Sequence, residues 1–522
     1  MKMMKNSIGR LVPAEEVPGL GKLAPYAGPF SRVIDSDYQA PRLAAPLKAV
    51  PPTRSKVVAD IKTAIKNSGL ENGMTISFHH HLRNGDAVLP MVMSALDEMG
   101  FRDLTIAPSS LTDAHNCVAD YVRKGVISRI FTSGVRGEVG KMISQGEMEI
   151  PVVVRSHGGR ARSIEEGSAS IDVAFLGAPA CDALGNMTGS MGKSACGSLG
   201  YAQVDAKYAR HVVAVTDNLV DYPLMPKISI PQHLVNQVVV VDSLGDPKKI
   251  ASGAARITRN PVDLKVAENA YKLVVASELL APGCSFQVGA GGASLAVAKY
   301  VREYMKEKGI KGSFGLGGIT GYMVQMLEDG LFEALFDVQS FDADVQSSIL
   351  NNPRHMEIDQ SWYANPLNRG CQVHNLDVVI LAALDVDVDF NVNVMTGNNG
   401  ILRGASGGHS DTAAGAKLSI VVAPAFRGGV PSIKEQVQTV VTPGETVDAI
   451  VTERGICINP NRKDLIELAR AAKLPVKDIH DLKAEVEKLT GVPEPVEFDM
   501  DKVVALVEYR DGTIIDSVYK VK

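Results

Sequence analysis

The stretch SFQVGAGGASLAVAKYVREYMKEKGIKGSFGLGGITGYMVQMLEDG, residues 285–330, contains the same unit twice. Each copy has a short apolar strand, a glycine cluster and an amphipathic helix, which is the order of elements in an α/β protein. Glycine lets backbone N–H groups come close to a ligand, and the start of a helix favours negative charge. The two turns therefore predict a site for an anion, or for negative charge that develops during a reaction.

Strand and helix signals also alternate on both sides of this stretch. MTISF, DLTIAP, ISRIFTS, IDVAFLGAP, HVVAVTD and QVVVVD precede it, and LDVVILAALDV, KLSIVVAP and DAIVTERG follow it. Apolar strands separated by helices predict an α/β fold with mainly parallel sheets. Each half begins with a helix, a strand and an unusual loop, FHHHLRNGD in one and VGAGG in the other. We therefore expect an internal duplication, with two similar domains that face each other.

The length of 522 residues exceeds what one hydrophobic core supports. Residues 1–54 hold eight of the 27 prolines and no periodic pattern, which predicts an extended Pro-rich N-terminal arm. We expect the first domain at residues 55–255 and the second at 256–522. Within the second domain, residues 461–492 are typical of surface helices and 497–521 of a closing strand or hairpin.

Composition argues against several classes of protein. A net charge of −5 gives no electrostatic basis for binding nucleic acid or an anionic membrane. No apolar run approaches the ~18 residues of a membrane helix, and no apolar segment of a signal peptide follows the N-terminus. The six cysteines are scattered without a CxxC pair. We therefore expect reduced thiols, a cytoplasmic location and no zinc site.

The triple histidine 79–81 follows the strand MTISF. Consecutive side chains at the end of a strand point to alternate faces, so at most two of the three can converge on one metal. A zinc site would need a further ligand such as His115, and we favour no metal. Loops at the carboxyl ends of parallel strands bind ligands in α/β proteins. The imidazoles and backbone N–H groups of this loop are therefore candidates to bind an acyl oxygen or a carboxylate.

The densest glycine region is GNNGILRGASGGHSDTAAGAKLSIVVAPAFRGGV, residues 397–430. One interpretation is a long surface loop, but a functional loop is favoured because the segment runs directly into a strong strand signal. Its glycines would let the backbone approach a ligand closely. Four side chains offer polar partners: Arg403, His409, Asp411 and Arg427.

Two other motifs have weaker interpretations. Asp385, Asp387 and Asp389 share one face of a strand, and we favour a solvated or interface-facing strand over a calcium ladder because no loop is present to wrap an ion. The segment GAGGAS has the order of a dinucleotide-binding turn. However, Ser294 replaces its third glycine and no acidic residue follows about 20 positions on, which argues against a nicotinamide site.

Several segments resemble known families. IDVAFLGAPACDALGNMTG is similar to a strand and Gly-Asn turn of coenzyme A transferases. FQVGAGGASLAVAKYV, LEDGLFEAL, GASGGHSDTAAGA and VVTERGICINPNR resemble the second half of the acetyl-coenzyme A hydrolase and transferase group. FHHHLRNGDAVLPMV, SHGGRARSIEEG and the Pro-rich arm resemble the citrate lyase alpha-subunit family. The resemblance covers nearly the whole chain and implies two coenzyme A transferase-like domains with the site in the cleft between them.

The resemblance also implies a reaction, that of a citrate coenzyme A-transferase. Citrate replaces acetyl on an acyl carrier (gamma) subunit, acetate leaves, and a separate lyase (beta) subunit cleaves the citryl thioester. No cofactor is expected to bind tightly to the chain, because the thioester is carried on a dephospho-coenzyme A-type arm, or on acetyl-coenzyme A in its place. We also expect a homo-oligomer. Alternatives are a free-standing acyl-coenzyme A hydrolase or transferase, a citramalate-specific homologue and a non-catalytic scaffold subunit.

The expected mechanism follows from the absence of a glutamate nucleophile at one position of the sequence. In covalent coenzyme A transferases a glutamate attacks the thioester, and in one branch it lies four residues before an Asp-Gly pair. Anchoring on Asp329 and Gly330 places Gln325 there, and an amide cannot act as a carboxylate nucleophile. We therefore expect citrate to attack directly, without a covalent enzyme intermediate.

The predicted site residues form two groups. The catalytic group is Gly289, Ala290, Gly291, Gly292, Gly317, Gly318 and Gln325. The substrate-binding group is His79, His80, His81, Arg83, Asn398, Arg403, Gly407, Gly408 and His409, with Arg136 and Arg427 as second-rank partners for carboxylates.

Overall fold

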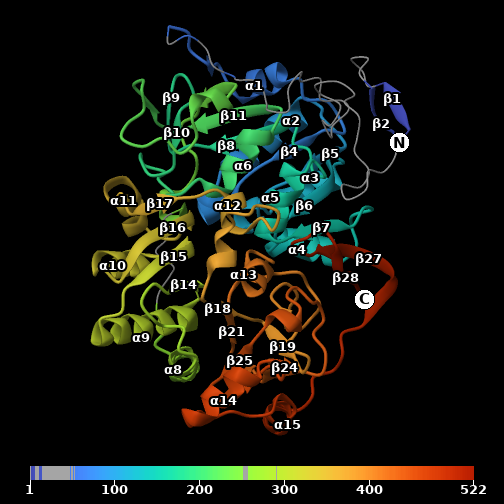
Figure 1. Cartoon of the computed structure of the whole chain (residues 1–522). Helices are drawn as coiled ribbons and strands as arrows, with labels where there is room; N and C mark the ends of the chain where they lie inside the picture. Colours follow the sequence, from blue (N-terminus) through green and yellow to red (C-terminus); the bar gives the residue numbers. More distant parts are fainter. Residues whose placement is uncertain are drawn as a thin grey trace.

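The computed structural model describes residues 2–5, 11–14, 48, 51, 53–250, 257–289 and 291–522. The predicted arm lies almost entirely outside these residues, as does the predicted boundary between residues 255 and 256. Two large sheets, each with helices packed against it, form the upper and lower parts of the described chain (Figure 1). The α/β class with mainly parallel sheets is confirmed.

The first sheet has ten described strands, and they are parallel except for one antiparallel pair at its edge, β28 with β27. In sheet order these strands are β28 (Ile514–Val521), β27 (Phe498–Glu508), β7 (Val152–Arg155), β6 (Ile127–Thr132), β5 (Leu104–Ile106), β4 (Thr75–Ser77), β8 (Val173–Gly177), β11 (His211–Thr216), β13 (Gln237–Val240) and β3 (Val57–Val58).

The second sheet has eight described strands and likewise one antiparallel edge pair, β25 with β26. In sheet order these are β17 (His355–Glu357), β16 (Phe332–Ser340), β15 (Gly312–Ile319), β14 (Ser285–Val288), β18 (Val378–Ala382), β21 (Leu418–Val422), β25 (Ala449–Thr452) and β26 (Gly455–Ile458).

Smaller sheets complete the described strands. Two have three strands each: β10 (Met187–Thr188), β9 (Ala180–Asp182) and β12 (Leu219–Val220) in one, and β20 (Val392–Asn393), β19 (Asp385–Asp387) and β24 (Ile433–Lys434) in the other. Two more are antiparallel pairs: β1 (Met3–Lys5) with β2 (Leu11–Pro13), and β22 (Phe426–Arg427) with β23 (Val430–Pro431).

The described helices before residue 251 are α1 (Ile61–Ser68), α2 (Val88–Glu98), α3 (Val118–Arg123), α4 (Gly137–Ser144), α5 (His157–Glu165), α6 (Gly200–Tyr208) and α7 (Pro247–Ile250). Those that follow are α8 (Pro261–Ala276), α9 (Gly292–Lys308), α10 (Gly321–Glu328), α11 (Ala343–Asn351), α12 (Gln360–Ala364), α13 (His409–Gly415), α14 (Lys463–Ala471) and α15 (Ile479–Thr490). The two surface helices predicted within residues 461–492 are therefore present as α14 and α15.

The order of strands confirms the internal duplication. The first sheet runs β7-β6-β5-β4-β8-β11-β13, and the second runs β17-β16-β15-β14-β18-β21-β25. The two three-stranded sheets also match, since each has one antiparallel and one parallel pair in the same order. The histidine loop after β4 therefore corresponds to the glycine loop after β14, as the sequence predicted.

The duplication extends to individual side chains. Asp182 Oδ1 accepts hydrogen bonds from the backbone N–H groups of Leu184 and Asn186, and Asn186 Nδ2 donates to Asp182 Oδ2 at 2.7 Å. In the second half, Asp387 Oδ1 accepts from the N–H of Asn391, whose Nδ2 lies 3.2 Å from Asp387 Oδ2. The same Asp-to-Asn turn therefore joins β9 to β10 and β19 to β20.

This turn corrects the interpretation of the aspartate run. Asp385 and Asp387 are both buried, and Asp385 forms an ion pair with Lys434 at 2.7 Å. A solvated strand is therefore wrong for these two residues, because β19 is only three residues long and its carboxylates pair with a turn and a partly buried lysine.

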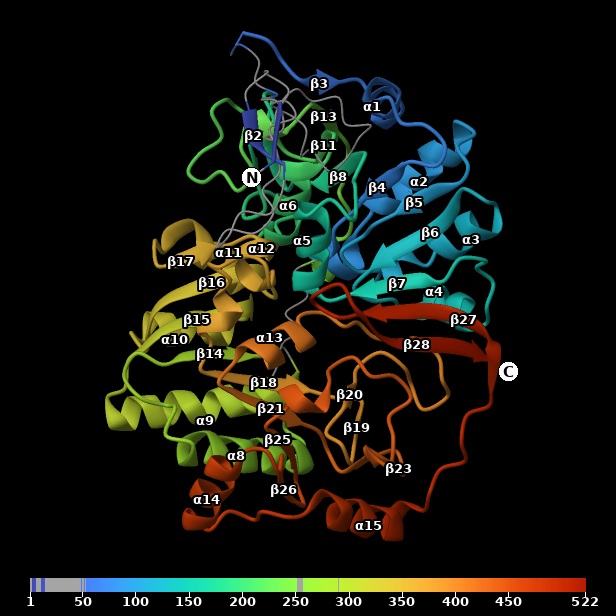
Figure 2. The same ribbon diagram turned by 45° about the vertical axis from the view of Figure 1, so that its right-hand side comes forward.

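The C-terminal hairpin joins the first sheet rather than the second. Strand β27 pairs with β7 in parallel and with β28 antiparallel, so the hairpin predicted at 497–521 is present. Both views place it beside β7 (Figures 1 and 2). The chain thus crosses from the second sheet back to the first before it ends.

Four helices pack where the two halves meet. Helices α5 and α6 of the first half contact α12 of the second, and α13 also contacts α5. These helices occupy equivalent places in the duplicated order of elements. Among the described residues, no helix is both long and apolar enough to cross a membrane.

Candidate active site

A cavity of about 690 Å³ opens between the two halves. It lies at the carboxyl ends of β14, β15, β16 and β18, where α/β proteins place their ligands. Three described residues of the first half line it: Arg136, His157 and Tyr201. The second half contributes Gln287, Val288, Gly289, Gly318, Gln339, Phe341, Tyr363, Leu381, Ala382, Ala383, Leu384, Val394, Arg403, Gly404, Ala405, Ser406, Gly408, His409 and Arg427.

The charge of this lining is entirely positive. Arg136, Arg403 and Arg427 are the ionised side chains, and no carboxylate, cysteine or lysine occurs among the described residues of the wall. Guanidinium groups match carboxylates with two parallel hydrogen bonds. The cavity is therefore suited to a substrate with several carboxylates, and its described wall offers no carboxylate or thiol as a nucleophile.

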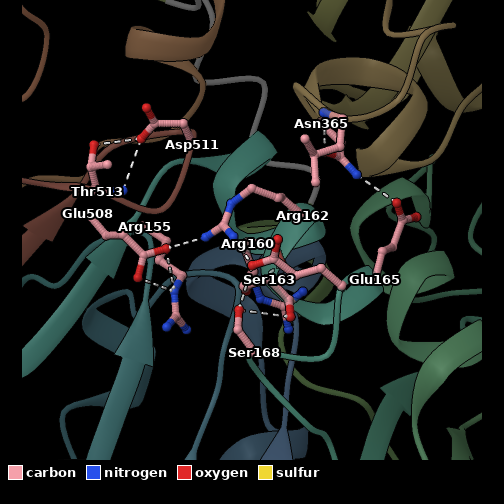
Figure 3. Close-up of polar contacts among 12 residues, drawn as sticks. Arg155, Arg160, Arg162, Ser163, Glu165, Ser168, Asn365, Glu508, Asp511 and Thr513 are labelled. Carbon is pink, nitrogen blue, oxygen red and sulfur yellow. Dashed lines mark hydrogen bonds and ion pairs between the residues drawn. The ribbon is translucent and has the colours of Figure 1, made fainter. Parts of the chain in front are cut away.

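Helix α5 holds His157 at the edge of the cavity, and Figure 3 shows how this helix is fixed on both sides. On one side, Arg155 Nε and Arg162 Nη2 lie 3.0 and 2.7 Å from carboxylate oxygens of Glu508 on the C-terminal hairpin. On the other, Glu165 accepts a hydrogen bond of 2.6 Å from Asn365 Nδ2, just beyond α12. The position of His157 therefore depends on both halves of the chain.

The triple histidine divides as alternation predicts. His79 and His81 turn into the first half, where His79 Nε2 lies 3.0 Å from Asp205 Oδ2 and His81 Nε2 donates to Gly177 O at 2.9 Å. His80 turns the other way, and its ring stacks on those of His157 and Tyr201. Only His80 therefore comes next to the cavity, behind two residues that line it.

His80 connects the first half to Gln339 of the second. Its Nδ1 lies 2.6 Å from Ser109 Oγ, and its Nε2 lies 3.2 Å from Gln339 Oε1. Because an amide oxygen can only accept, His80 carries its proton on Nε2 and accepts from the Ser109 hydroxyl. Burial, reinforced by His157, lowers the pKa of His80 well below its usual value, so the ring is neutral. These hydrogen bonds from Ser109 through His80 fix the orientation of the Gln339 amide and leave its N–H groups free to donate to a ligand.

The glycine loop at 404–408 forms part of the wall. The backbone N–H of His157 donates to Gly407 O at 2.7 Å, which ties this loop to α5. A Cβ on Gly408 would lie 2.6 Å from Tyr363 Oη, so only glycine fits there. His409 Nδ1 lies 2.7 Å from Thr442 Oγ1, and burial lowers the pKa of His409 to about 4. The segment 397–430 is thus ordered, and seven of its residues line the cavity.

Asp411 does not line the cavity, and its side chain instead holds two helices together. It accepts hydrogen bonds of 2.8 Å from Ser156 Oγ and from the N–H of Gly158, at the start of α5. Burial raises the pKa of Asp411 to about 6, although Arg510 opposes the shift. The carboxylate therefore joins α13 to α5.

Gln325 is not part of the cavity. It lies on the exposed face of α10, where its Oε1 accepts a hydrogen bond of 3.4 Å from Arg302 Nη1. The other face of α10 buries Met323, Val324, Met326 and Leu327, so helical periodicity turns Gln325 toward solvent. The structure therefore does not bring Gln325 to the cavity, where a catalytic residue was expected.

The glycine turns also differ from the expected pair of anion nests. The N–H of Gly289 already donates to Ile380 O at 3.1 Å, so Gly289 lines the cavity without a free N–H. The N–H of Gly321, at the start of α10, donates to Asp342 Oδ2 at 2.7 Å. The anion at the second helix start is therefore the protein's own carboxylate.

The remaining predicted residues fall in different places. Gly318 lines the cavity, whereas Gly291 and Gly292 are at the start of α9 and are not among its described lining, and Ala290 lies outside the described residues. The Arg83 guanidinium stacks on Phe341, 4.3 Å from the ring centre, so it lies beside the cavity. Asn398 is exposed and accepts a hydrogen bond from Lys434 Nζ.

Sequence reasoning missed most of the uncharged polar wall: Tyr201, Gln287, Gln339, Tyr363 and Ser406. His157 lies in SHGGRARSIEEG, which carried part of the family resemblance but suggested no role for the histidine. Gln287 and Gln339 lie in β14 and β16, and the sequence around each of them predicts only an ordinary buried strand. Only the sheet order brings them to one cavity.

Comparison with known proteins identifies the family. The family model for the citrate lyase alpha subunit matches residues 54–521. The chain belongs to the citrate lyase alpha-subunit family. It is 52% identical over 500 residues to the citrate lyase alpha chain of Klebsiella pneumoniae, with 96% of each chain covered. It is 49% identical to that of Haemophilus influenzae, with 90% of this chain and 93% of the relative covered.

Solved structures agree with this assignment. A crystal structure described as the citrate lyase alpha subunit of Streptococcus mutans in complex with citrate superposes with a TM-score of 0.89 at 51% identity, covering 92% of this chain and 94% of that one. A chain of a Pseudomonas malonate decarboxylase hetero-tetramer has a TM-score of 0.62 at 16% identity, covering 84% and 88%. The second likeness concerns the coenzyme A transferase-like fold alone. The resemblance in the sequence to citrate lyase alpha subunits is confirmed.

The buried His81 should make the stability of this chain sensitive to acid. Burial, reinforced by His79, lowers the pKa of His81 to about 4, whereas an unfolded histidine titrates near 6.5. Between these values the unfolded state binds more protons, so the free energy of unfolding falls as the pH falls, by up to about 1.4 kcal/mol per unit for this group.

Urea unfolding between pH 6.5 and 5 measures this effect. We expect His81→Gln to make the free energy of unfolding depend less steeply on pH. The reduction in slope should correspond to nearly one proton fewer taken up on unfolding. His480→Gln on α15 replaces an exposed histidine and is the matched control. A slope in the His81 variant equal to that of the wild type would contradict the assignment.

Proposed function

We propose that the chain exchanges acyl groups on a thioester, replacing acetyl by citrate on an acyl carrier and releasing acetate. The observation that carries the proposal is the wall of the cavity, with three arginines and no carboxylate or thiol nucleophile among its described residues. A covalent transferase needs such a nucleophile. Direct attack by the substrate needs only a site that holds two reactants together.

Citrate is the substrate that this charge pattern favours. Its three carboxylates match Arg136, Arg403 and Arg427, whereas citramalate has only two carboxylates for the same three groups. The complex of the Streptococcus mutans relative with citrate supports the choice. Arg83 lies behind Phe341 and adds positive potential at the same edge of the cavity.

The reaction proceeds in two acyl transfers. A citrate carboxylate oxygen attacks the acetyl thioester carbonyl, the C–S bond breaks, and a mixed anhydride and a thiolate form. The thiolate then attacks the citryl carbonyl of the anhydride, and acetate leaves. Each bond that forms is matched by one that breaks, and no group of the chain is acylated.

Carboxylates are weak nucleophiles, so the chain must lower the barrier in other ways. Holding both reactants in line supplies roughly 7–11 kcal/mol, and one well-placed oxyanion donor supplies about 3–4 kcal/mol. The amide N–H groups of Gln339, oriented by His80, are suited to donate to the oxyanion. Burial, with a contribution from Arg160, lowers the pKa of His157 to about 3, so this ring is neutral and does not compete for the carboxylates.

Two partner subunits follow from this reaction. The thioester arrives on the dephospho-coenzyme A-type arm of an acyl carrier (gamma) subunit, and a citryl lyase (beta) subunit cleaves the product in the cytoplasm. No cofactor need bind tightly to this chain, because the arm supplies the thiol. We also propose that the chain forms a homo-oligomer.

An exchange assay tests the function. The purified chain is mixed with acetylated carrier and citrate, and released acetate and citryl carrier are measured by mass spectrometry. We expect both products in equal amounts. Full activity on acetyl-coenzyme A alone, without citrate, would favour an acyl-coenzyme A hydrolase. Carrier binding without exchange would identify a scaffold subunit and refute the proposal.

A further inference from the structure

Gln287, one of the residues that line the cavity, has an unpaired hydrogen-bond acceptor. Its side chain is at the carboxyl end of β14 and the residue is 8% exposed. Its Nε2 donates to Tyr363 Oη at 2.9 Å, but no donor in the described part of the chain reaches its buried Oε1. Buried amide oxygens are nearly always paired, because an unpaired one loses its bond to water without replacement. A ligand in the cavity is the natural source of the missing donor.

The surrounding backbone keeps this amide in place. A Cβ on Gly317 would lie 2.7–3.0 Å from the amide atoms of Gln287, so the strand β15 packs closely against the side chain. Gly317 has a φ of +100°, which favours glycine. The hydrogen bond to Tyr363 fixes the other end of the amide. The acceptor therefore cannot turn away to find another partner.

The positive wall limits what the donor can be. An ammonium group would be repelled by Arg136, Arg403 and Arg427, and a carboxyl group beside them would be ionised and could not donate. A neutral hydroxyl satisfies both conditions. Citrate carries one hydroxyl on the carbon that bears its central carboxylate.

We propose that Gln287 Oε1 accepts a hydrogen bond from the hydroxyl of the substrate acid, so that the chain selects a hydroxytricarboxylate over the same acid without the hydroxyl. This inference rests on the proposed function. A site built to pair a substrate hydroxyl rejects the analogue that lacks it, because its own polar group is then left unpaired. In this arrangement the three arginines bind the carboxylates of the acid, and Gln287 binds its hydroxyl group.

Gln339 provides a contrast within the same cavity. Its Oε1 is already paired with His80 Nε2 at 3.2 Å, so it has no unpaired acceptor for a hydroxyl. Replacing Gln339 by methionine changes the same residue type in the same wall. It should therefore leave the selection for the hydroxyl unchanged, whatever it does to the rate.

The test compares citrate with tricarballylate, propane-1,2,3-tricarboxylate, which differs only in lacking the hydroxyl. Isothermal titration calorimetry gives the Kd of each acid, and the exchange assay gives KM and kcat. We expect the wild type to bind citrate about tenfold or more tightly than tricarballylate. In Gln287→Met and Gln287→Leu that ratio should fall to within about twofold, while the affinity for tricarballylate is kept or improved.

The results separate two failures. Absence of acyl exchange in the wild type would refute the proposed function without bearing on which group meets Gln287. Exchange with citrate, together with equal wild-type affinities for the two acids, would overturn the inference and leave a bound water as the partner of Oε1. A wild-type ratio retained in both Gln287 variants would overturn it as well. Because the first comparison uses only the wild type, a variant that fails to fold does not block the test.

Discussion

Replacing Arg403 by alanine should raise the KM for citrate by about 10-fold to 150-fold and leave the KM for the acyl carrier nearly unchanged. Arg403 lines the cavity from the glycine loop, and an antiparallel bridge between Gly134 and Ala405 brings this loop beside the segment of Arg136. Losing a charge-assisted pair with a carboxylate costs about 1.5–3 kcal/mol. Steady-state exchange kinetics, with citrate and carrier varied separately, measure the two constants.

The matched control is Arg470→Ala, which removes an exposed arginine on α14 far along the chain from the cavity loops. It should change neither KM. If the Arg403 variant raised both constants equally, Arg403 would have no special role toward citrate. Arg427 would then be the next candidate, because it is the other arginine of this loop that reaches the cavity.

Replacing Gly158 by alanine should destabilise the contact between the two halves by about 3 kcal/mol and sharply reduce kcat. A Cβ at this position would overlap the carbonyl oxygen of Ala364 and lie 2.6 Å from Asp411 Oδ1. Both are groups of the second half, so α5 would have to move away from α12 and α13. His157, the neighbouring residue, would move with it.

Thermal unfolding and exchange kinetics of the Gly158 variant check this prediction. Gly370→Ala is a suitable control, since its added Cβ would have no neighbour closer than 3.4 Å. The control should be close to the wild type in both measurements. Wild-type stability and kcat in the Gly158 variant would mean that the fit of α5 between the halves does not position the site.

The sequence correctly predicted the features that depend on the order of neighbouring residues along the chain. Each glycine cluster between an apolar strand and a helix marked a strand-to-helix turn, and β14, α9, β15 and α10 follow in that order. The repeat of this order in both halves was enough to predict the duplication. The loop around Arg403 and His409 was also recognised, because a dense glycine segment before a strong strand signal is unusual.

The features that it did not predict depend on how distant segments meet. Gln287 and Gln339 come from β14 and β16, which are separated in the sheet by β15, and His157 comes from the other half. No spacing along the chain places these three side chains in one cavity. The position of Gln325 outside the cavity was not predicted for a related reason, since a short match around Asp329 does not show which face of α10 is buried.

We propose that citrate attacks the thioester directly and that the chain is never acylated. The most direct test is to quench the exchange reaction during turnover with hydroxylamine or borohydride and to measure the intact mass of this chain. We expect an unchanged mass at every time point, because the described wall of the cavity contains no carboxylate or thiol to be modified. A stoichiometric adduct on a glutamate or aspartate of the chain would contradict it.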